Sequence, residues 1–150
     1  VQSVQTMAKI AVETERQLSY ETAISKAKTH IPAISGVISR AACNAANELK
    51  AASIVCSTKS GATAKRISQC RPDCPIVAVT ETELVAKSLA FNFGVYPIVA
   101  ESKTVMDERI EKATELAVEN GFASKGDTVV IAAGMGQVGS TNLLKVSVIE

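Results

Sequence analysis

The chain has 150 residues, with 16 Lys and Arg against 15 Asp and Glu, which gives a formal net charge of +1. The length suits one ordinary domain, and a composition of 47% hydrophobic and 21% charged residues excludes a disordered chain. The near-zero charge excludes an electrostatic nucleic-acid binder, and no apolar run approaches the ~20 residues of a membrane span. No basic region followed by an apolar core opens the sequence, so we expect no signal peptide.

A helix and a linker are predicted for residues 1–32. Apolar side chains recur at helical spacing through residues 1–19 without a capping residue at the start, so we expect the chain to begin inside or just before a helix. Residues 20–32 are mostly polar and end in Ile31-Pro32, which indicates a linker. The chain is therefore divided into a helix at 1–20, a linker at 21–32 and a domain at 33–150.

From residue 33 onward, helical segments alternate with short apolar strands. The first helix of this domain is predicted to face the core with one stripe, which consists of Ile34, Ile38, Ala41, Ala45 and Leu49. A strand at 52–57, a short helix at 61–69 and a second strand at 75–79 follow.

The next helix is expected to begin with a capping box. Thr80 and Glu83 have the T-x-x-E spacing of this motif, which predicts a helix through about residue 91. A third strand at 95–99 contains Pro97, which favours a place near the edge of the sheet because proline cannot donate a hydrogen bond to a neighbouring strand.

The longest helix is predicted at 104–120, with a stop at Gly121 and an inner stripe of Met106, Ile110, Ala113 and Ala117. A strand at 128–133 follows, and a glycine loop leads to a last strand at 144–148. Strands joined by helices run parallel, whereas the last strand follows too closely for a crossover helix and should be antiparallel. The expected fold is an α/β fold, a three-layer α/β/α sandwich around a mixed five-stranded sheet.

The loop at 58–63 follows the first strand and opens a helix, at a position where open α/β sheets bind ligands. It offers three hydroxyl groups, one ammonium group and a glycine, contributed by Thr58, Lys59, Ser60, Gly61 and Thr63. Backbone N–H groups and the helix dipole attract a phosphate at such a position. Arg109, in the first turn of the longest helix, should lie at the same edge and could hold a second phosphate. An ordinary capped turn and a solvated surface arginine are the alternatives.

Gly134, Gly136 and Gly139 have the G-x-G-x-x-G spacing of a dinucleotide fingerprint. The segment after them leads into a strand instead of a helix, and no acidic ribose partner follows ~20 residues later, so dinucleotide binding is not expected. We expect a tight loop beside the carboxyl edge of the sheet, which could fold over a ligand held by residues 58–63.

Groups for catalysis or metal binding are scarce. His30 is the single histidine and lies in the predicted linker, so no Ser-His or Cys-His pair is expected. The four cysteines lack the spacing of a disulfide framework or a zinc site and are expected to be reduced thiols of a cytosolic protein: Cys43, Cys56, Cys70 and Cys74. We therefore predict no catalytic residue and no metal site in this chain.

Seven segments together resemble the C-terminal domain of pyruvate kinase. They lie at residues 4–7, 10–12, 51–55, 71–72, 75–80, 94–97 and 139–142, so the resemblance runs through essentially the whole chain. The set R-P-x-x-P-I-V-A-V-T, G-V-Y-P and G-S-T-N is highly specific. The N-terminal helix resembles the last helix of that enzyme's catalytic barrel, so residues 1–20 would be a remnant of it.

The resemblance implies a regulatory role. In pyruvate kinases this domain binds an allosteric effector, often fructose 1,6-bisphosphate, and helps to form the tetramer. The resemblance assigns one phosphate to the loop at 58–63, the other to Arg109, and closure over the sugar to the loop at 134–142. Fructose-bisphosphate-activated animal enzymes have a tryptophan where this chain has Ser102, and their glycine loop is longer. AMP and ribose 5-phosphate are therefore alternative effectors.

The resemblance also implies where the activity resides. Intact pyruvate kinase is a cytoplasmic glycolytic enzyme that transfers phosphoryl from phosphoenolpyruvate to ADP with Mg²⁺ and K⁺, through residues of a barrel that this chain lacks. The chain alone is expected to be inactive and to carry no cofactor. Its implied partners are the effector, its own barrel and further copies of the same chain. A stand-alone phospho-ligand binding module or small hydrolase with the same fold is the alternative.

Overall fold

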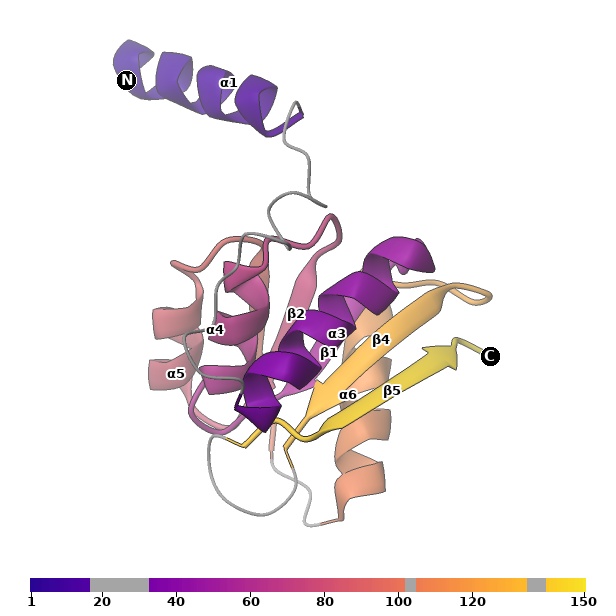
Figure 1. Ribbon diagram of the computed structural model, residues 1–150. Helices are drawn as coiled ribbons and strands as arrows, with labels where there is room; N and C mark the ends of the chain where they lie inside the picture. Colours follow the sequence, from indigo (N-terminus) through magenta and orange to yellow (C-terminus); the bar gives the residue numbers. More distant parts are fainter. Residues whose placement is uncertain (17–32, 102–104, 135–139) are drawn as a thin grey trace.

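The structure of the chain, a computed structural model, describes residues 1–16, 33–101, 105–134 and 140–150 (Figure 1). The predicted linker at 21–32, Gly136 and Gly139 lie outside these residues. The elements in chain order are α1 (Gln2–Arg16), α3 (Ile34–Glu48), β1 (Ser53–Ser57), α4 (Ala62–Gln69), β2 (Ile76–Thr80), α5 (Glu83–Leu89), β3 (Val95–Val99), α6 (Met106–Glu119), β4 (Thr128–Ala133) and β5 (Leu143–Val148). All of the predicted strands are present, with ends within one residue of the prediction.

The strands form one mixed sheet in the order β3-β2-β1-β4-β5. β1 lies parallel between β2 and β4, and β3 continues the parallel pairing beyond β2. β5 pairs antiparallel with β4, as its short connection predicts. β3, which contains Pro97, is an edge strand. The carboxyl ends of the four parallel strands therefore lie along one edge of the sheet.

Helices cover both faces of the sheet and complete the predicted three layers (Figure 1). α3, α4 and α5 cover one face, where Ile54 and Ile76 of the strands pack with Ile67 of α4. α6 covers the other face, where Val55 and neighbouring strand residues pack with Ile110. Successive strand residues such as Ile54 and Val55 point to opposite faces, so each buried strand contributes to both cores.

The inner face of α3 differs from the predicted stripe. Ile34 is 70% exposed and Leu49 is 50% exposed, while the buried residues are Ser39, Ala42, Cys43 and Ala46. Small side chains let the helix approach the strands closely. The sequence-based prediction weighted large apolar residues, and was therefore wrong by about one position around the helix.

The predicted capping box is also wrong. Thr82 caps α5, because its side chain accepts a hydrogen bond from the Val85 backbone N–H at 3.4 Å. Thr80 instead ends β2 and is buried. The strand ends one residue later than expected, which keeps Thr80 in the sheet, and the next threonine, Thr82, caps the helix.

The side chains of α1 that the structure describes are exposed, including the apolar Val4, Met7 and Ile10. None of the helices in the described residues is long and apolar enough to cross a membrane.

Candidate functional site

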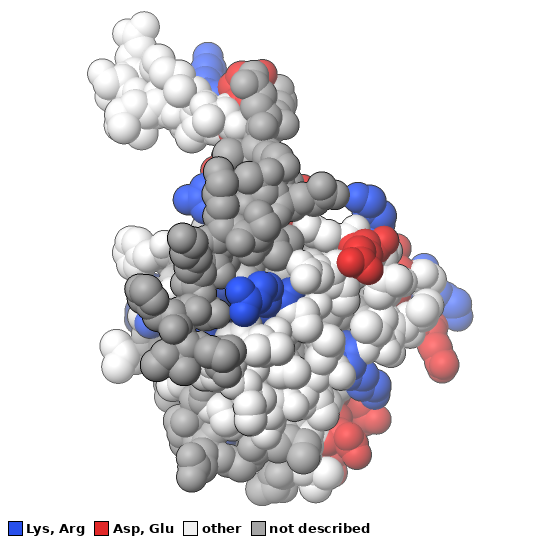
Figure 2. All heavy atoms as spheres, in the orientation of Figure 1, with Lys and Arg blue, Asp and Glu red and all other residues white. Residues whose placement is uncertain are grey.

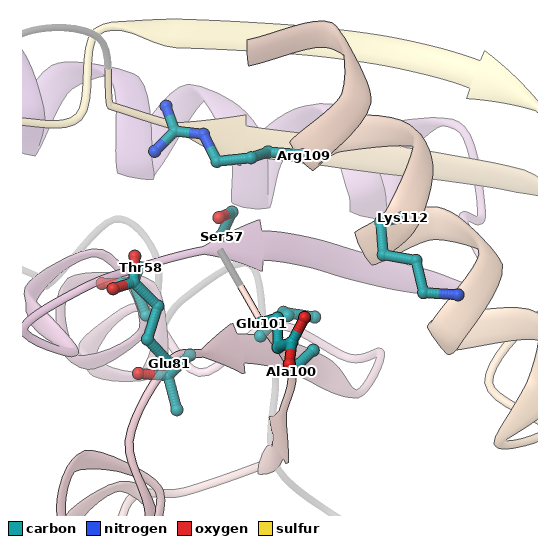
Figure 3. A pocket seen from close by; sticks show the side chains of 9 residues that line it. Ser57, Thr58, Glu81, Ala100, Glu101, Arg109 and Lys112 are labelled. Carbon is teal, nitrogen blue, oxygen red and sulfur yellow. The ribbon is translucent and has the colours of Figure 1, made fainter. Parts of the chain in front are cut away.

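A small cleft of about 20 Å³, open to solvent, lies where β1, β2 and β3 end and α6 begins (Figure 3). It is lined by Ser57, Thr58, Val79, Thr80, Glu81, Ala100, Glu101, Arg109 and Lys112. Three parallel strands place their first loop residues side by side there, so polar groups far apart in the sequence converge. The structure thus brings together two of the predicted site residues, Thr58 and Arg109.

Two side chains of the cleft carry buried polar atoms that have no hydrogen-bond partner in the described part of the chain. These atoms are the Thr80 hydroxyl oxygen and Arg109 Nε. Thr80 is only 2% exposed, so solvent reaches little of it. A buried polar group without a partner costs roughly 1–3 kcal/mol. An oxygen-rich ligand in the cleft would supply the missing partner of Arg109 Nε.

Arg109 supplies the positive charge that is nearest the end of β1. It extends from α6 over Ser57, and its guanidinium contacts Met106 Sδ at 3.4 Å (Figure 3). Lys112 lies one turn further along α6 and donates to Glu115 at 3.1 Å, which raises the Lys112 pKa. That pairing draws the Lys112 ammonium away from the cleft, so Arg109 is the more available cation.

The loop at 58–63 forms a closed turn. Gly61 has a φ of +79°, and its N–H donates to the Thr58 hydroxyl at 3.0 Å. A Cβ on Gly61 would come within 3.0 Å of Leu89 Cδ2, so this position favours glycine in both backbone shape and space. The turn places Thr58 in the cleft lining, whereas Ser60 and Gly61 are not part of that lining.

Lys59 lies at the rim of the cleft. Its ammonium is 3.7 Å from Glu81, and the two side chains are 54% and 37% exposed. An ion pair this exposed contributes about 0–1 kcal/mol, so the lysine can exchange Glu81 for a phosphate at small cost.

The side chain of Thr63 contacts the segment that precedes β5, and it does not line the cleft. Its hydroxyl lies 2.8 Å from the Thr141 hydroxyl, and both side chains are buried. Gly134 lies so close to the Ser140 backbone that a Cβ there would collide with the Ser140 carbonyl. These contacts fix both ends of the glycine loop beside α4. Thr63 therefore supports the loop base, and it is not part of the cleft lining.

Sequence reasoning missed five polar residues of the cleft: Ser57, Thr80, Glu81, Glu101 and Lys112. Thr80, Glu81 and Glu101 stand at or just after the ends of two neighbouring strands, which is the signal that could have identified them. Lys112 follows Arg109 by about one helical turn. The lining contains the carboxylates of Glu81 and Glu101 as well as the cations of Arg109 and Lys112, so the cleft is mixed in charge.

A larger groove of about 590 Å³ runs between α6 and β5. Its lining includes Glu111, Glu115, Glu119 and Glu150 but a single lysine, Lys145. This excess of negative charge disfavours a phosphorylated ligand. The cleft at the strand ends therefore remains the better phosphate site.

No group of three or more His, Cys, Asp or Glu side chains that could hold a metal ion occurs among the residues that the structure describes. No disulfide joins Cys43, Cys56, Cys70 or Cys74 in the described part of the chain.

Comparison with known proteins identifies the domain. Residues 36–147 match the family described as "Pyruvate kinase, alpha/beta domain". Over 153 residues, which cover 100% of the chain, it is 41% identical to a pyruvate kinase of Clostridium acetobutylicum and 40% identical to one of Geobacillus stearothermophilus. These stretches are 32% and 26% of the relatives, so the chain spans about a quarter to a third of their length. The chain therefore belongs to the pyruvate kinase alpha/beta domain family.

Proposed function

We propose that this domain binds a phosphorylated effector in the cleft at the strand ends and serves as the regulatory and assembly domain of a pyruvate kinase. The observation that carries the proposal is the unpartnered Arg109 Nε, in a cleft that Thr58 also lines. Phosphate oxygens accept hydrogen bonds from guanidinium and hydroxyl groups, and a charge-assisted bond to arginine is among the stronger ones.

The charges around the cleft favour a particular class of effector. Arg109 and Lys59 can attract one phosphate, while Glu81 and Glu101 would repel a second one placed beside them. The same carboxylates can accept hydrogen bonds from ligand hydroxyl groups. This arrangement supports a sugar monophosphate or nucleoside monophosphate, such as ribose 5-phosphate or AMP, over fructose 1,6-bisphosphate.

Calorimetric titration of the three ligands into the chain tests the effector site. Lys59→Glu removes an attraction and adds a third carboxylate at the rim, so affinity should fall at least roughly tenfold. Lys125→Glu makes the same charge change before β4, at the opposite end of the sheet, and should leave affinity unchanged. Absence of binding by the unmodified chain would refute the effector site. An equal loss of affinity in both variants would mean that the ligand does not bind beside Lys59.

Assembly is proposed to use the free edge of β5. Val146 and Val148 are 44% and 57% exposed, and no strand among the described residues pairs with the outer side of β5. Exposed Ile34 and Val37 of α3 extend the apolar surface over the same face, where Figure 2 shows mostly uncharged atoms. Exposed strand edges readily pair with other chains.

Sedimentation analysis of two edge variants tests assembly. Val146→Lys introduces a charge on β5 and should shift the chain toward monomer. Val99→Lys makes the same change on β3, the other edge strand, where Val99 is 47% exposed, and should not. A monomeric unmodified chain at high micromolar concentration would contradict the proposal.

The activity of the whole protein is proposed from its family. A barrel outside these residues would transfer phosphoryl from phosphoenolpyruvate to ADP with Mg²⁺ and K⁺ in cytoplasmic glycolysis, and this domain would adjust its rate. The relatives, which are pyruvate kinases, support this role over a stand-alone module or small hydrolase.

A further inference from the structure

Three thiols gather around the end of α4 that is farthest from the cleft. Cys43 lies in the middle of α3, Cys70 is the residue that ends α4, and Cys74 precedes β2. All three pack with the same apolar core. Nothing in the proposed effector site uses them.

Cys43 and Cys70 lie next to each other in this group. The Cys43 thiol donates to the Ile67 carbonyl and the Cys70 thiol to the Arg66 carbonyl, each at 3.7 Å. These carbonyls belong to neighbouring residues in the last turns of α4. The Cys43 thiol comes from α3 and the Cys70 thiol from the end of α4, so the two thiols lie against the same turn of α4.

The two thiols differ in reactivity. The neighbouring Cys43 thiol and the positive charge of Arg40 lower the Cys70 pKa below that of an ordinary thiol, whereas burial raises the Cys56 pKa to about 12. The thiolate is the form that reacts with oxidants. Cys70 is 6% exposed and Cys43 is fully buried, so a small oxidant meets Cys70 first.

We propose that Cys43 and Cys70 form an oxidation-sensitive pair that closes a reversible disulfide between α3 and the end of α4. A hydroperoxide is the oxidant. The Cys70 thiolate attacks the peroxide oxygen, which gives a sulfenic acid and, from hydrogen peroxide, hydroxide that takes up a proton to become water. Cys43 then attacks the Cys70 sulfur, the S–O bond breaks, and a second water leaves. Two thiols thus lose two electrons to one peroxide.

The resulting bond would fix two helices that cover the same face of the sheet. It closes the chain between residues 43 and 70, a segment that contains β1 and α4. A disulfide stabilises a protein mainly by restricting its unfolded chain. Oxidation should therefore raise the midpoint of thermal unfolding by roughly 4 °C or more.

Peptide mapping by mass spectrometry tests the pairing directly. The chain is treated with hydrogen peroxide near one equivalent, remaining thiols are alkylated, and disulfide-linked peptides are identified. We expect a Cys43–Cys70 linkage that dithiothreitol reverses, with Cys56 alkylated only after unfolding. A Cys70–Cys74 linkage, sulfinic acid at Cys70, or no loss of thiols would each overturn the proposal.

Thermal unfolding provides a second measurement that depends on the same bond. The peroxide-dependent rise in midpoint should disappear in Cys70→Ser and persist in Cys56→Ser, which removes a thiol from the same core. A rise that persists in Cys70→Ser would contradict the assignment. So would a rise that dithiothreitol fails to reverse, because methionine oxidation then accounts for it.

Discussion

Thr63 and Thr80 are both buried near the carboxyl edge of the sheet, at 3% and 2% exposure, yet their hydroxyl groups have opposite surroundings. The Thr63 hydroxyl pairs with Thr141 at 2.8 Å, on the side of the sheet that carries α4. The Thr80 hydroxyl has no partner among the described residues, and Thr80 is one of the residues that line the cleft beside α6. The hydroxyl group of Thr63 therefore has its hydrogen-bond partner within the fold, whereas the hydroxyl group of Thr80 does not.

This difference separates residues that hold the loops from residues that can hold a ligand. A satisfied buried hydroxyl stabilises the fold, and an unsatisfied one lowers stability until something binds it. Substitutions at the Thr63–Thr141 contact should therefore change the free energy of unfolding. Substitutions in the lining of the cleft should instead change the affinity for the effector.

The largest effect is expected for Arg109→Gln, which removes the charge of the cleft but leaves a polar side chain. One charge-assisted contact contributes about 1.5–3 kcal/mol, so effector affinity should fall at least roughly tenfold. Arg109→Lys should lose less, because it keeps the charge. Calorimetric titration measures both, and equal affinities for all three proteins would place the phosphate elsewhere.

Thr63→Val is expected to destabilise the fold by about 1–3 kcal/mol, because it leaves the buried Thr141 hydroxyl without its partner. Thr63→Ser keeps the hydroxyl and serves as the control. Urea unfolding followed by circular dichroism measures the difference. If Val and Ser variants unfold at the same denaturant concentration, the Thr63–Thr141 contact contributes nothing to stability.

Thr80→Val should have the opposite effects on stability and affinity. It removes an unpartnered buried hydroxyl at nearly constant volume, so the free energy of unfolding should stay the same or rise by up to about 1 kcal/mol. Effector affinity should fall. Urea unfolding and calorimetry on the same sample separate the two effects, and a clear loss of stability would mean that the hydroxyl has a partner after all.

Glu81→Gln is expected to have the smallest effect on stability, within about 0.5 kcal/mol, because the Lys59 ion pair is exposed. It should raise affinity for a phosphorylated ligand, since a negative charge leaves the cleft and Lys59 is released. Glu83→Gln, which removes a charge from another exposed pair outside the cleft, is the matched control. Identical affinities in the two variants would show that Glu81 does not oppose binding.

The fold could be predicted almost completely from the sequence because its signals are local. Each apolar run forms a strand between helices, Pro97 marks an edge strand, and Gly121 follows the end of α6 with a φ of +78°. The two errors arose where local signals compete. Two threonines, Thr80 and Thr82, were available as caps, and large and small residues alternate around α3.

The candidate site was less predictable because it depends on which strands are neighbours. Thr58 and Arg109 were found from loop and helix positions. Thr80 and Glu101 enter the cleft only because β2 and β3 lie next to β1 in that order. The position of Thr63 depends on Thr141, 78 residues away, and no local pattern reveals such a contact.

The closed base of the glycine loop has a consequence for how this domain can change. Gly134 against the Ser140 backbone and the Thr63–Thr141 contact fix both ends of the segment, independently of what lies between them. A side chain at position 134 or the loss of the Thr63 hydroxyl would therefore act on the same place, the point where β4 ends and the chain returns into β5. Sequence change that keeps the pairing of β4 with β5 should consequently avoid these anchor positions, however freely it proceeds on the exposed outer side of β5.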